Sequence, residues 1–276
     1  MSAGEGSGSE VERVPQVNGD DERRSSSFGA EAGLYDRFRP APPRDAVEFM
    51  LPAHVSVVVD VGAGTGALTR MLVERADRVI AVEPDPRMRE VLENQVLGIQ
   101  VVAGRGERMP VPDASIDAVL ASSSWHWVDR DQGFAEVARV LAPGGTFGAV
   151  WTGPDLDSPF ISQARLLLTA TESDAGADLE STVFDRDTPD PVLAVPDGAP
   201  FSLPEHRTVA WDIALNADEL IGLLGTFSWV LLMEDQRRKA LVTEARRLLA
   251  DGLGVAGDVT VDVGFKAEAW RSRFIG

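Results

Sequence analysis

The stretch Val57–Leu72, with the sequence VVVDVGAGTGALTRML, decides the fold of this chain. Its apolar, mostly β-branched start continues the preceding residues and predicts a buried strand over Val55–Val61. Apolar residues then recur at the spacing of one helix face, which predicts a helix from about 66 to 76. The two elements are joined by a very short glycine-rich turn, so the stretch reads as a strand running directly into a helix.

Gly62, Gly64 and Gly66 form the turn between this strand and helix. Glycine lets the backbone bend sharply and approach a ligand without interference from a Cβ atom. The first N–H groups of a helix have no partner within the helix, and they hold carboxylates or phosphates well. The turn is therefore a candidate ligand-binding site.

Further along the chain, short apolar runs alternate with segments of helical period, which is typical of an α/β fold with a mostly parallel sheet. Four more strands are expected, at 79–83, 99–103, 116–121 and 146–151. Helices are expected after the first and third of these, from Pro86 to Gln95 and around Phe134–Leu141, the latter ended by Pro143-Gly144-Gly145. Five strands with short connections then occupy roughly 100 residues.

The pattern loosens after Trp151. A helix is expected around Ser158–Ala170, and a stretch rich in proline and aspartate continues to about Pro204. Asn216 and Glu219 have the spacing of a capping box, ahead of apolar residues at helical spacing up to Leu231. A second amphipathic helix is expected around 241–249, and Asp258–Phe265 alternates as a strand does, which we expect at the sheet edge.

These patterns divide the chain into a tail and one domain. Residues 1–27 are rich in glycine, serine and acids and are expected to be disordered. The domain, 28–276, has an N-terminal cap, a core, a variable cover of helix and loop, and a C-terminal part with helices and the sheet edge; these four parts span 28–54, 55–151, 152–204 and 205–276.

Composition excludes several classes of function. The formal charge of −18 disfavours binding to nucleic acids and to anionic membranes. No run of residues is apolar enough to span a membrane. The chain has no cysteine and three widely spaced histidines, so no metal site is expected. The first residues lack the pattern of a secretory signal, and cytoplasmic residence is the default expectation.

The glycine spacing bears on the type of ligand. The turn reads G-x-G-x-G, whereas dinucleotide enzymes use G-x-G-x-x-G. Glu83 ends the next strand about 20 residues later, where an acid accepts hydrogen bonds from ribose hydroxyls. A nucleoside ligand is therefore expected. A short-chain nicotinamide reductase would need a Tyr-x-x-x-Lys pair, which the chain lacks: Tyr35 is followed by Arg39, and the lysines are Lys239 and Lys266.

Three ordered segments resemble motifs of class I S-adenosylmethionine-dependent methyltransferases: Asp60–Gly66, Val82–Asp85 and Gly104–Asp117. The resemblance implies a Rossmann-like, mostly parallel seven-stranded sheet flanked by helices. It also implies that S-adenosylmethionine is the cofactor. The implied contacts are with its amino-acid part for Asp60, Gly62, Gly64 and Gly66, with its ribose for Glu83, and with its adenine for Pro84, Gly106, Glu107 and Met109. Arg105 stands where many relatives carry an acid that binds the adenine amino group.

Two further segments resemble the small-molecule branch of that family that includes trans-aconitate methyltransferases, or type 11 group. Tyr35–Pro40 is similar to the segment that caps the cofactor, with Tyr35 and Arg39 as implied contacts; it can equally be an ordinary first helix. Ser122–Asp129, with Ser122 next to the cofactor, resembles an aromatic-His-Trp pattern at the carboxyl end of the fourth strand, where ligands of such sheets bind.

The acceptor of the methyl group is expected beside this second segment. His126 is a candidate general base if it faces the pocket; alternatively, it packs with its neighbours beneath the following helix. The candidate acceptor pocket consists of aromatic residues that can also be plain core residues: Trp125, Trp127, Trp211, Phe227 and Trp229.

The sequence thus predicts an S-adenosylmethionine-dependent methyltransferase that acts on a small molecule. Methyl transfer from a sulfonium needs positioning and exclusion of water more than catalytic side chains, which agrees with a clear cofactor motif and no catalytic triad. The alternative is a protein that keeps the cofactor fold without methylating, as a cyclase-like enzyme or a binding helper. No motif predicts the oligomeric state.

Overall fold

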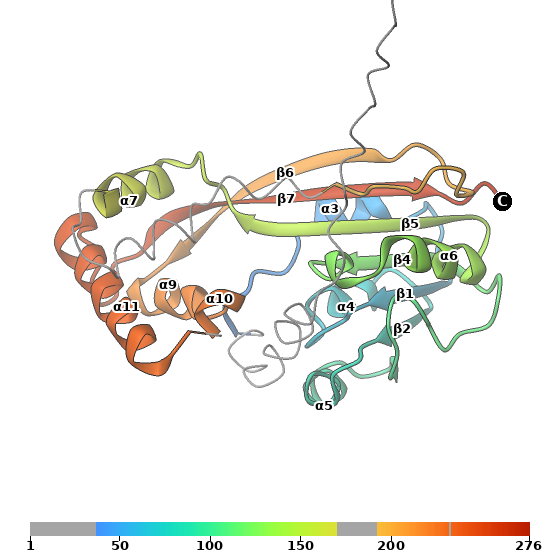
Figure 1. The fold of residues 1–276 in the computed structure, drawn as a ribbon, viewed down its shortest axis with the longest axis horizontal. Coiled ribbons are helices and arrows are strands. Elements are labelled where there is room, and N and C mark those ends of the chain that lie inside the picture. The colour runs from blue at the N-terminus through green and yellow to red at the C-terminus, as the bar shows by residue number, and fades with distance from the viewer. Residues whose placement is uncertain (1–36, 170–191, 232) are drawn as a thin grey trace, which may run out of the picture.

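The computed structural model describes residues 37–169, 192–231 and 233–276. The predicted tail, Tyr35 and much of the predicted cover lie outside the described residues. The elements shown in Figure 1 have the following bounds: α3 Arg44–Met50, β1 Val57–Val61, α4 Ala67–Leu72, β2 Arg78–Val82, α5 Pro86–Gln95, β3 Gln100–Val102, β4 Ile116–Ser122, α6 Arg130–Val140, β5 Leu141–Pro154, α7 Pro159–Thr169, β6 Glu205–Leu215, α9 Ala217–Leu224, α10 Ser228–Leu231, α11 Asp235–Arg247 and β7 Val261–Arg273.

The strands form one seven-stranded sheet in the order β3-β2-β1-β4-β5-β7-β6. Neighbouring strands from β3 to β5 pair in parallel, whereas β7 is antiparallel to both β5 and β6. The expected α/β fold with a mostly parallel, seven-stranded sheet is confirmed. Among the described residues, no helix has the length and apolar character needed to cross a membrane.

Alternation along the buried strands produces a core on each side of the sheet. Val59 belongs to one apolar cluster, together with Phe134 and Val137 of α6. Its neighbour Val58 belongs to another cluster, with residues of α3 and α4 such as Leu68. Successive side chains of a strand point to opposite faces. Helix α6 therefore covers one face of the parallel half of the sheet, and α3 and α4 cover the other.

A separate helical lobe is built on the far ends of the long strands β6 and β7 (Figure 1). Apolar residues of α7, α9, α10 and α11 pack there against Val263 and Phe265 of β7. The capping box that starts α9 is confirmed: the Glu219 N–H donates to Asn216 Oδ1 at 3.0 Å, and the Asn216 N–H donates to Glu219 Oε2 at 2.9 Å. The single helix expected up to Leu231 is instead broken between α9 and α10.

The structure corrects the expected end of the sheet. The C-terminal strand β7 lies between β5 and β6, and β6 is the edge strand. Strand β6 was not predicted, although Val209, Trp211, Ile213 and Leu215 alternate along it. Helix α6 ends at Val140, close to the expected end, but β5 begins at Leu141 rather than at Thr146, so that Pro143-Gly144-Gly145 lies within β5.

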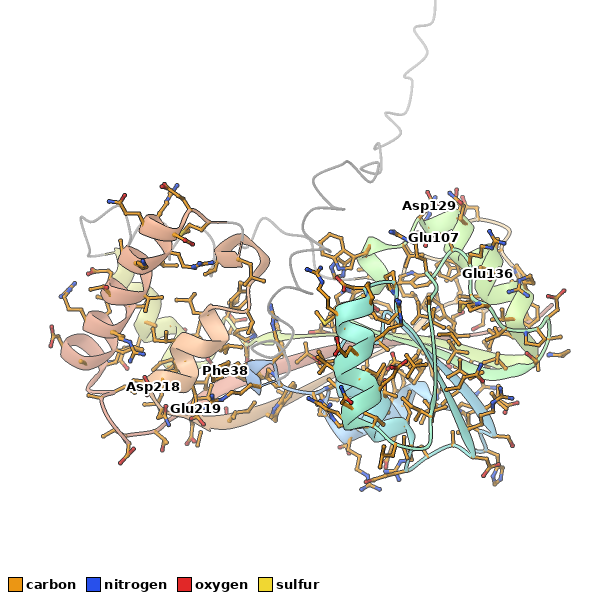
Figure 2. The ribbon with its side chains drawn as sticks, turned by 90° about the horizontal axis from the view of Figure 1, so that it is seen from below. Phe38, Glu107, Asp129, Glu136, Asp218 and Glu219 are labelled. Atoms are coloured by element: carbon orange, nitrogen blue, oxygen red, sulfur yellow. The ribbon has the colours of Figure 1, made fainter. Side chains whose placement is uncertain are left out.

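The segment before α3 ties the helical lobe to the sheet. Phe38 lies beside α9, the helix that carries Asp218 and Glu219 (Figure 2). A Cβ atom at Gly222 of α9 would come within 2.4 Å of the Phe38 ring. The Phe38 ring therefore occupies the space that a side chain at position 222 would fill.

This contact makes an unusual prediction for Gly222→Ala. Alanine is favoured over glycine inside a helix by about 1 kcal/mol, yet we expect the substitution to lower the free energy of unfolding by about 1 to 3 kcal/mol because the Phe38 ring must move. Urea denaturation measures the effect. In a Phe38→Ala background the same substitution should become neutral or stabilising, and an equal loss in both backgrounds would contradict the packing argument.

Candidate functional site

A cavity of about 1300 Å³ opens at the carboxyl ends of the parallel strands. This is the position at which open α/β sheets bind ligands. The described residues that line it come from three parts of the chain. The parallel half supplies the β1–α4 turn, the ends of β2, β4 and β5, the loop before β4, and the starts of α4, α5 and α6 with the short segment before α6. The segment before α3 and the segment between α9 and α10 supply the rest. Most of the sequence-predicted site residues lie on its walls.

The glycine turn forms one wall. Gly62, Gly64 and Gly66 have φ angles of 66°, 58° and 96°, which disfavour residues with a side chain. A Cβ at Gly62 would come within 2.5 Å of the Ser124 side chain, whereas at Gly64 it would meet nothing within 4 Å. Gly62 thus lets the turn approach the end of β4, and Gly64 exposes backbone to open space.

Glu83 follows β2 and is held by the same turn. Its Oε2 accepts from the Gly64 N–H at 2.9 Å, and its Oε1 accepts from the Asp85 N–H at 2.8 Å. The side chain is buried, and burial raises the pKa of its carboxyl, against the effect of the two backbone donors. Each carboxylate oxygen can accept more than one hydrogen bond, so Glu83 retains capacity for a ligand hydroxyl.

Asp60 is the buried acid at the end of β1. Its Oδ2 accepts from the Thr69 hydroxyl at 2.6 Å, while its Oδ1 has no hydrogen-bond partner among the described residues. Burial, together with the nearby Glu83, raises the pKa of Asp60 to about 7. A buried oxygen without a partner is costly. A ligand that brings a cationic donor to this carboxylate would remove that cost.

The loop before β4 places Arg105, Gly106 and Glu107 on the cavity wall. Glu107 Oε1 accepts from the Asp129 N–H at 2.8 Å, and Figure 2 shows these two residues next to each other at one end of α6. Met109 is a correction to the sequence analysis. It lies in the core, its N–H donates to Glu136 of α6, and Met88 of α5 lines the cavity instead.

The end of β4 carries a backbone conformation under strain. Ser122 and Ser123 line the cavity, and Ser123 has a φ of 49°, which is uncommon for a residue with a side chain. The Ser124 hydroxyl donates to the Val61 carbonyl at 2.6 Å and so joins the ends of β4 and β1. Strain of this kind persists where the surroundings fix the backbone, as they do here.

A short 3₁₀-helix, Trp125–Trp127, follows. Trp127 and His126 line the cavity, and their ring centroids are 4.5 Å apart. The Trp151 Nε1–H, at the end of β5, donates to His126 Nδ1 at 3.2 Å. Trp125 is a second correction: it is buried in the core against Phe134 and Phe147 rather than on the cavity wall. Trp151 was predicted only as a strand end.

The helical lobe supplies the opposite wall. Phe227 lines the cavity, and the Arg39 guanidinium lies 4.6 Å from the centroid of its ring. Arg39 Nε–H also donates to the buried Thr226 hydroxyl at 3.0 Å. Trp211 is a third correction, because it packs against Phe265 in the helical lobe. The side chain of Trp229 lies outside what the structure describes.

Comparison with known proteins agrees with the class of fold that the sheet order and the glycine turn define. A family model described as a methyltransferase domain, type 11, matches residues 59–149. An uncharacterized methyltransferase of Mycobacterium tuberculosis is 37% identical over 226 residues, which are 82% of this chain and 86% of the relative. A methyltransferase-like protein of Schizosaccharomyces pombe is 26% identical and covers 79% of this chain and 84% of its own. The chain therefore belongs to the methyltransferase family.

A solved structure supports the same fold. A protein described as a candidate type II methyltransferase from Anaeromyxobacter dehalogenans is 26% identical, with a TM-score of 0.55, and the match covers 86% of this chain and 98% of that one. The match extends well beyond the segment recognised by the family model.

The raised pKa of Asp60 predicts how stability depends on pH in the ligand-free protein. The unfolded side chain ionises near its ordinary value of 3.8 and the folded one near 7, so the folded state holds the extra proton between these values. Stability should therefore fall as pH rises through this window and remain low above it. At 1.36 kcal/mol per pKa unit, the loss between pH 5 and pH 8 is at most on the order of 3 kcal/mol.

Asp60→Asn should remove this dependence and leave the ligand-free variant more stable than the wild type at pH 8. Urea denaturation at pH 5 and pH 8 measures it, with the exposed Asp77→Asn as the control. A variant that loses stability equally at both pH values would show that Asp60 is ionised in the fold at pH 5.

Proposed function

We propose that this methyltransferase binds S-adenosylmethionine in the cavity and transfers its methyl group to a small-molecule acceptor. The observation that carries the proposal is Oδ1 of Asp60, which has no hydrogen-bond partner within the described part of the chain and is buried beside a glycine turn and a helix start. The same cavity holds Glu83 at the end of the adjacent strand. We infer that Asp60 would face the amino-acid part of such a cofactor and Glu83 its ribose.

The residues at the β1–α4 turn fit the amino-acid part of the cofactor. Asp60 offers a carboxylate for an ammonium group, and the Thr65 hydroxyl, another buried group without a hydrogen-bond partner among the described residues, lines the cavity close by in sequence. The Gly64 backbone faces open space. These groups would hold a zwitterion by complementary charge and by backbone donors.

The residues after β2 fit a nucleoside. Glu83 is already oriented by two backbone donors and can accept from ribose hydroxyls. Pro84 and Met88 offer apolar surface for an adenine ring. Gly106 lies in the same wall, and a Cβ there would come within 2.6 Å of Val128. The missing side chain lets Val128 pack close to the loop.

When bound, the cofactor supplies a methyl group on a sulfonium, which is activated for in-line displacement. The chain then has to orient the acceptor and exclude water. His126, Trp127, Trp151 and Phe227 line the part of the cavity built from the ends of β4 and β5 and from the helical lobe. A small acceptor fits this part of the cavity, and the charge of −18 disfavours a nucleic acid.

Calorimetric titration tests the cofactor assignment. The wild type should bind S-adenosylmethionine and neither NADH nor NADPH. Glu83→Ala should weaken binding by about 1 to 3 kcal/mol, because the ribose hydroxyls lose their acceptor. The exposed Glu90→Ala on α5 is the matched control and should bind as the wild type does. Binding of a nicotinamide alone, or equal affinity in Glu83→Ala and Glu90→Ala, would contradict the proposal.

Transfer of the methyl group needs its own experiment. The protein is incubated with methyl-labelled S-adenosylmethionine and with fractions of a small-molecule extract, a protein extract and RNA. Label should enter a small molecule, with formation of S-adenosylhomocysteine. Tight cofactor binding without turnover in any fraction would instead favour a cofactor-fold protein that does not methylate.

A further inference from the structure

Two buried acids line the cavity, and their hydrogen-bond partners differ. Asp60 is 1% exposed and Glu83 is 7% exposed. Glu83 accepts from two backbone N–H groups, those of Gly64 and Asp85. Asp60 accepts from the Thr69 hydroxyl through Oδ2, whereas its Oδ1 has no hydrogen-bond partner within the described part of the chain. Asp60 is therefore the acid whose negative charge is less well stabilised.

The surroundings of Asp60 oppose that charge. Strand β1 lies between β2 and β4, and the residues paired with Asp60 on these strands are Ala81 and Leu120, both apolar. Helix α4 contributes the Thr69 hydroxyl. The charged group that acts on Asp60 is Glu83, and its like charge disfavours a second carboxylate in the same buried region.

The nearby cations act on other groups. The charged side chains of α4, and of the first turn of α5 with its N-cap, are Arg70, Asp85, Arg87 and Arg89. None of these four described residues is a cause of the pKa shift of Asp60, which comes from burial, Glu83 and Thr69. Arg87 pairs with Asp85, and Arg89 lowers the pKa of Glu83.

A buried carboxylate without a cationic partner tends to take up a proton, because the neutral form costs less to bury. The pKa of about 7 for Asp60 agrees with this argument. A proton on Oδ1 leaves the hydrogen bond from Thr69 to Oδ2 in place. Near pH 6 the ligand-free protein would thus hold Asp60 as a neutral acid.

An ammonium group reverses this preference. A positive charge close to a carboxylate favours its ionised form. The cofactor proposed above carries one ammonium group, and the wall that it would meet includes Asp60. The carboxyl group of Asp60 would therefore lose its proton as the ammonium group binds.

We propose that cofactor binding is coupled to the release of one proton from Asp60, so that the site takes up its cofactor less tightly as the pH falls below neutral. The proposal rests on the function proposed above and adds regulation of the same site by pH. In this step the Oδ1–H bond of Asp60 breaks and the proton passes to solvent. The ammonium group of the cofactor keeps its three hydrogens.

Calorimetry of the full chain with S-adenosylhomocysteine, which carries the same ammonium group, tests the coupling. Titrations at pH 6 in phosphate and in bis-Tris, which have different heats of ionisation, count the protons released. The wild type should release about one proton at pH 6, and its affinity should rise about tenfold or more from pH 5.5 to pH 7. No binding at pH 7.5 would contradict the proposed function. Binding without proton release at pH 6 would overturn only the coupling.

Asp60→Asn identifies the group that releases the proton. Because asparagine does not ionise, this variant should release no proton, and its affinity should change less than about threefold from pH 5.5 to pH 7. The exposed Asp77→Asn is the matched control and should behave as the wild type does. Proton release that persists in Asp60→Asn would assign the proton to another group and overturn the proposal.

Two variants that keep Asp60 should move the coupling in opposite directions. Thr69→Val removes the hydroxyl that stabilises the carboxylate, so the half-point of proton release should move to higher pH. Glu83→Gln removes the neighbouring negative charge, so the half-point should move to lower pH. A half-point that stays the same in Thr69→Val, or a shift of either variant in the other direction, would contradict the role of Asp60.

Infrared spectroscopy observes the proton directly. At pH 6 the wild type should lose the C=O stretch of one protonated carboxyl group when S-adenosylhomocysteine binds. The difference spectrum of Asp60→Asn should lack this loss, and that of Asp77→Asn should keep it. A protonated carboxyl band that persists in the wild type with ligand bound would overturn the proposal.

Discussion

The turn from β1 into α4 is the constraint on which the rest of the site depends. Its backbone adopts positive φ angles that only glycine tolerates readily, and it reaches the end of β4 because Gly62 leaves space for Ser124. The same turn donates the Gly64 N–H to Glu83. One short segment thereby fixes the relative positions of three strand ends. A side chain at Gly62 would collide with Ser124 and disturb the turn that holds Glu83.

The part of the cavity beside the helical lobe depends on the length of the strands that carry the lobe. The three strands β5, β7 and β6 extend past the parallel core and carry the helical lobe on their far ends (Figure 1). The segment before α3 crosses to that lobe, where Phe38 fits beside Gly222 and Arg39 binds Thr226. Arg39 and Phe227 reach the cavity only because the lobe and this segment are tied together. This part of the cavity wall therefore forms only when parts of the chain that are distant in sequence pack together.

This difference explains what the sequence could predict. The glycine turn and Glu83 are local signals: each comes directly after an apolar strand, and parallel strands bring their carboxyl ends together. Met109 and Trp125 were misplaced because an apolar side chain near a motif looks the same whether it faces a ligand or the core. The edge position of β6 depends on pairing with β7, which lies about 50 residues later in the chain. Thr226 and Trp151 contact Arg39 and His126, which lie far from them in the sequence, so no local pattern predicts these contacts.

The family model matches residues 59–149, which end two residues before Trp151. The recognised segment holds the glycine turn and Glu83, while Arg39, Trp151 and Phe227 of the same cavity come from outside it. Segments before, within and after the recognised stretch thus line one cavity. On the proposed function, substitutions in the helical lobe would change the acceptor that is methylated and leave the methyl donor the same.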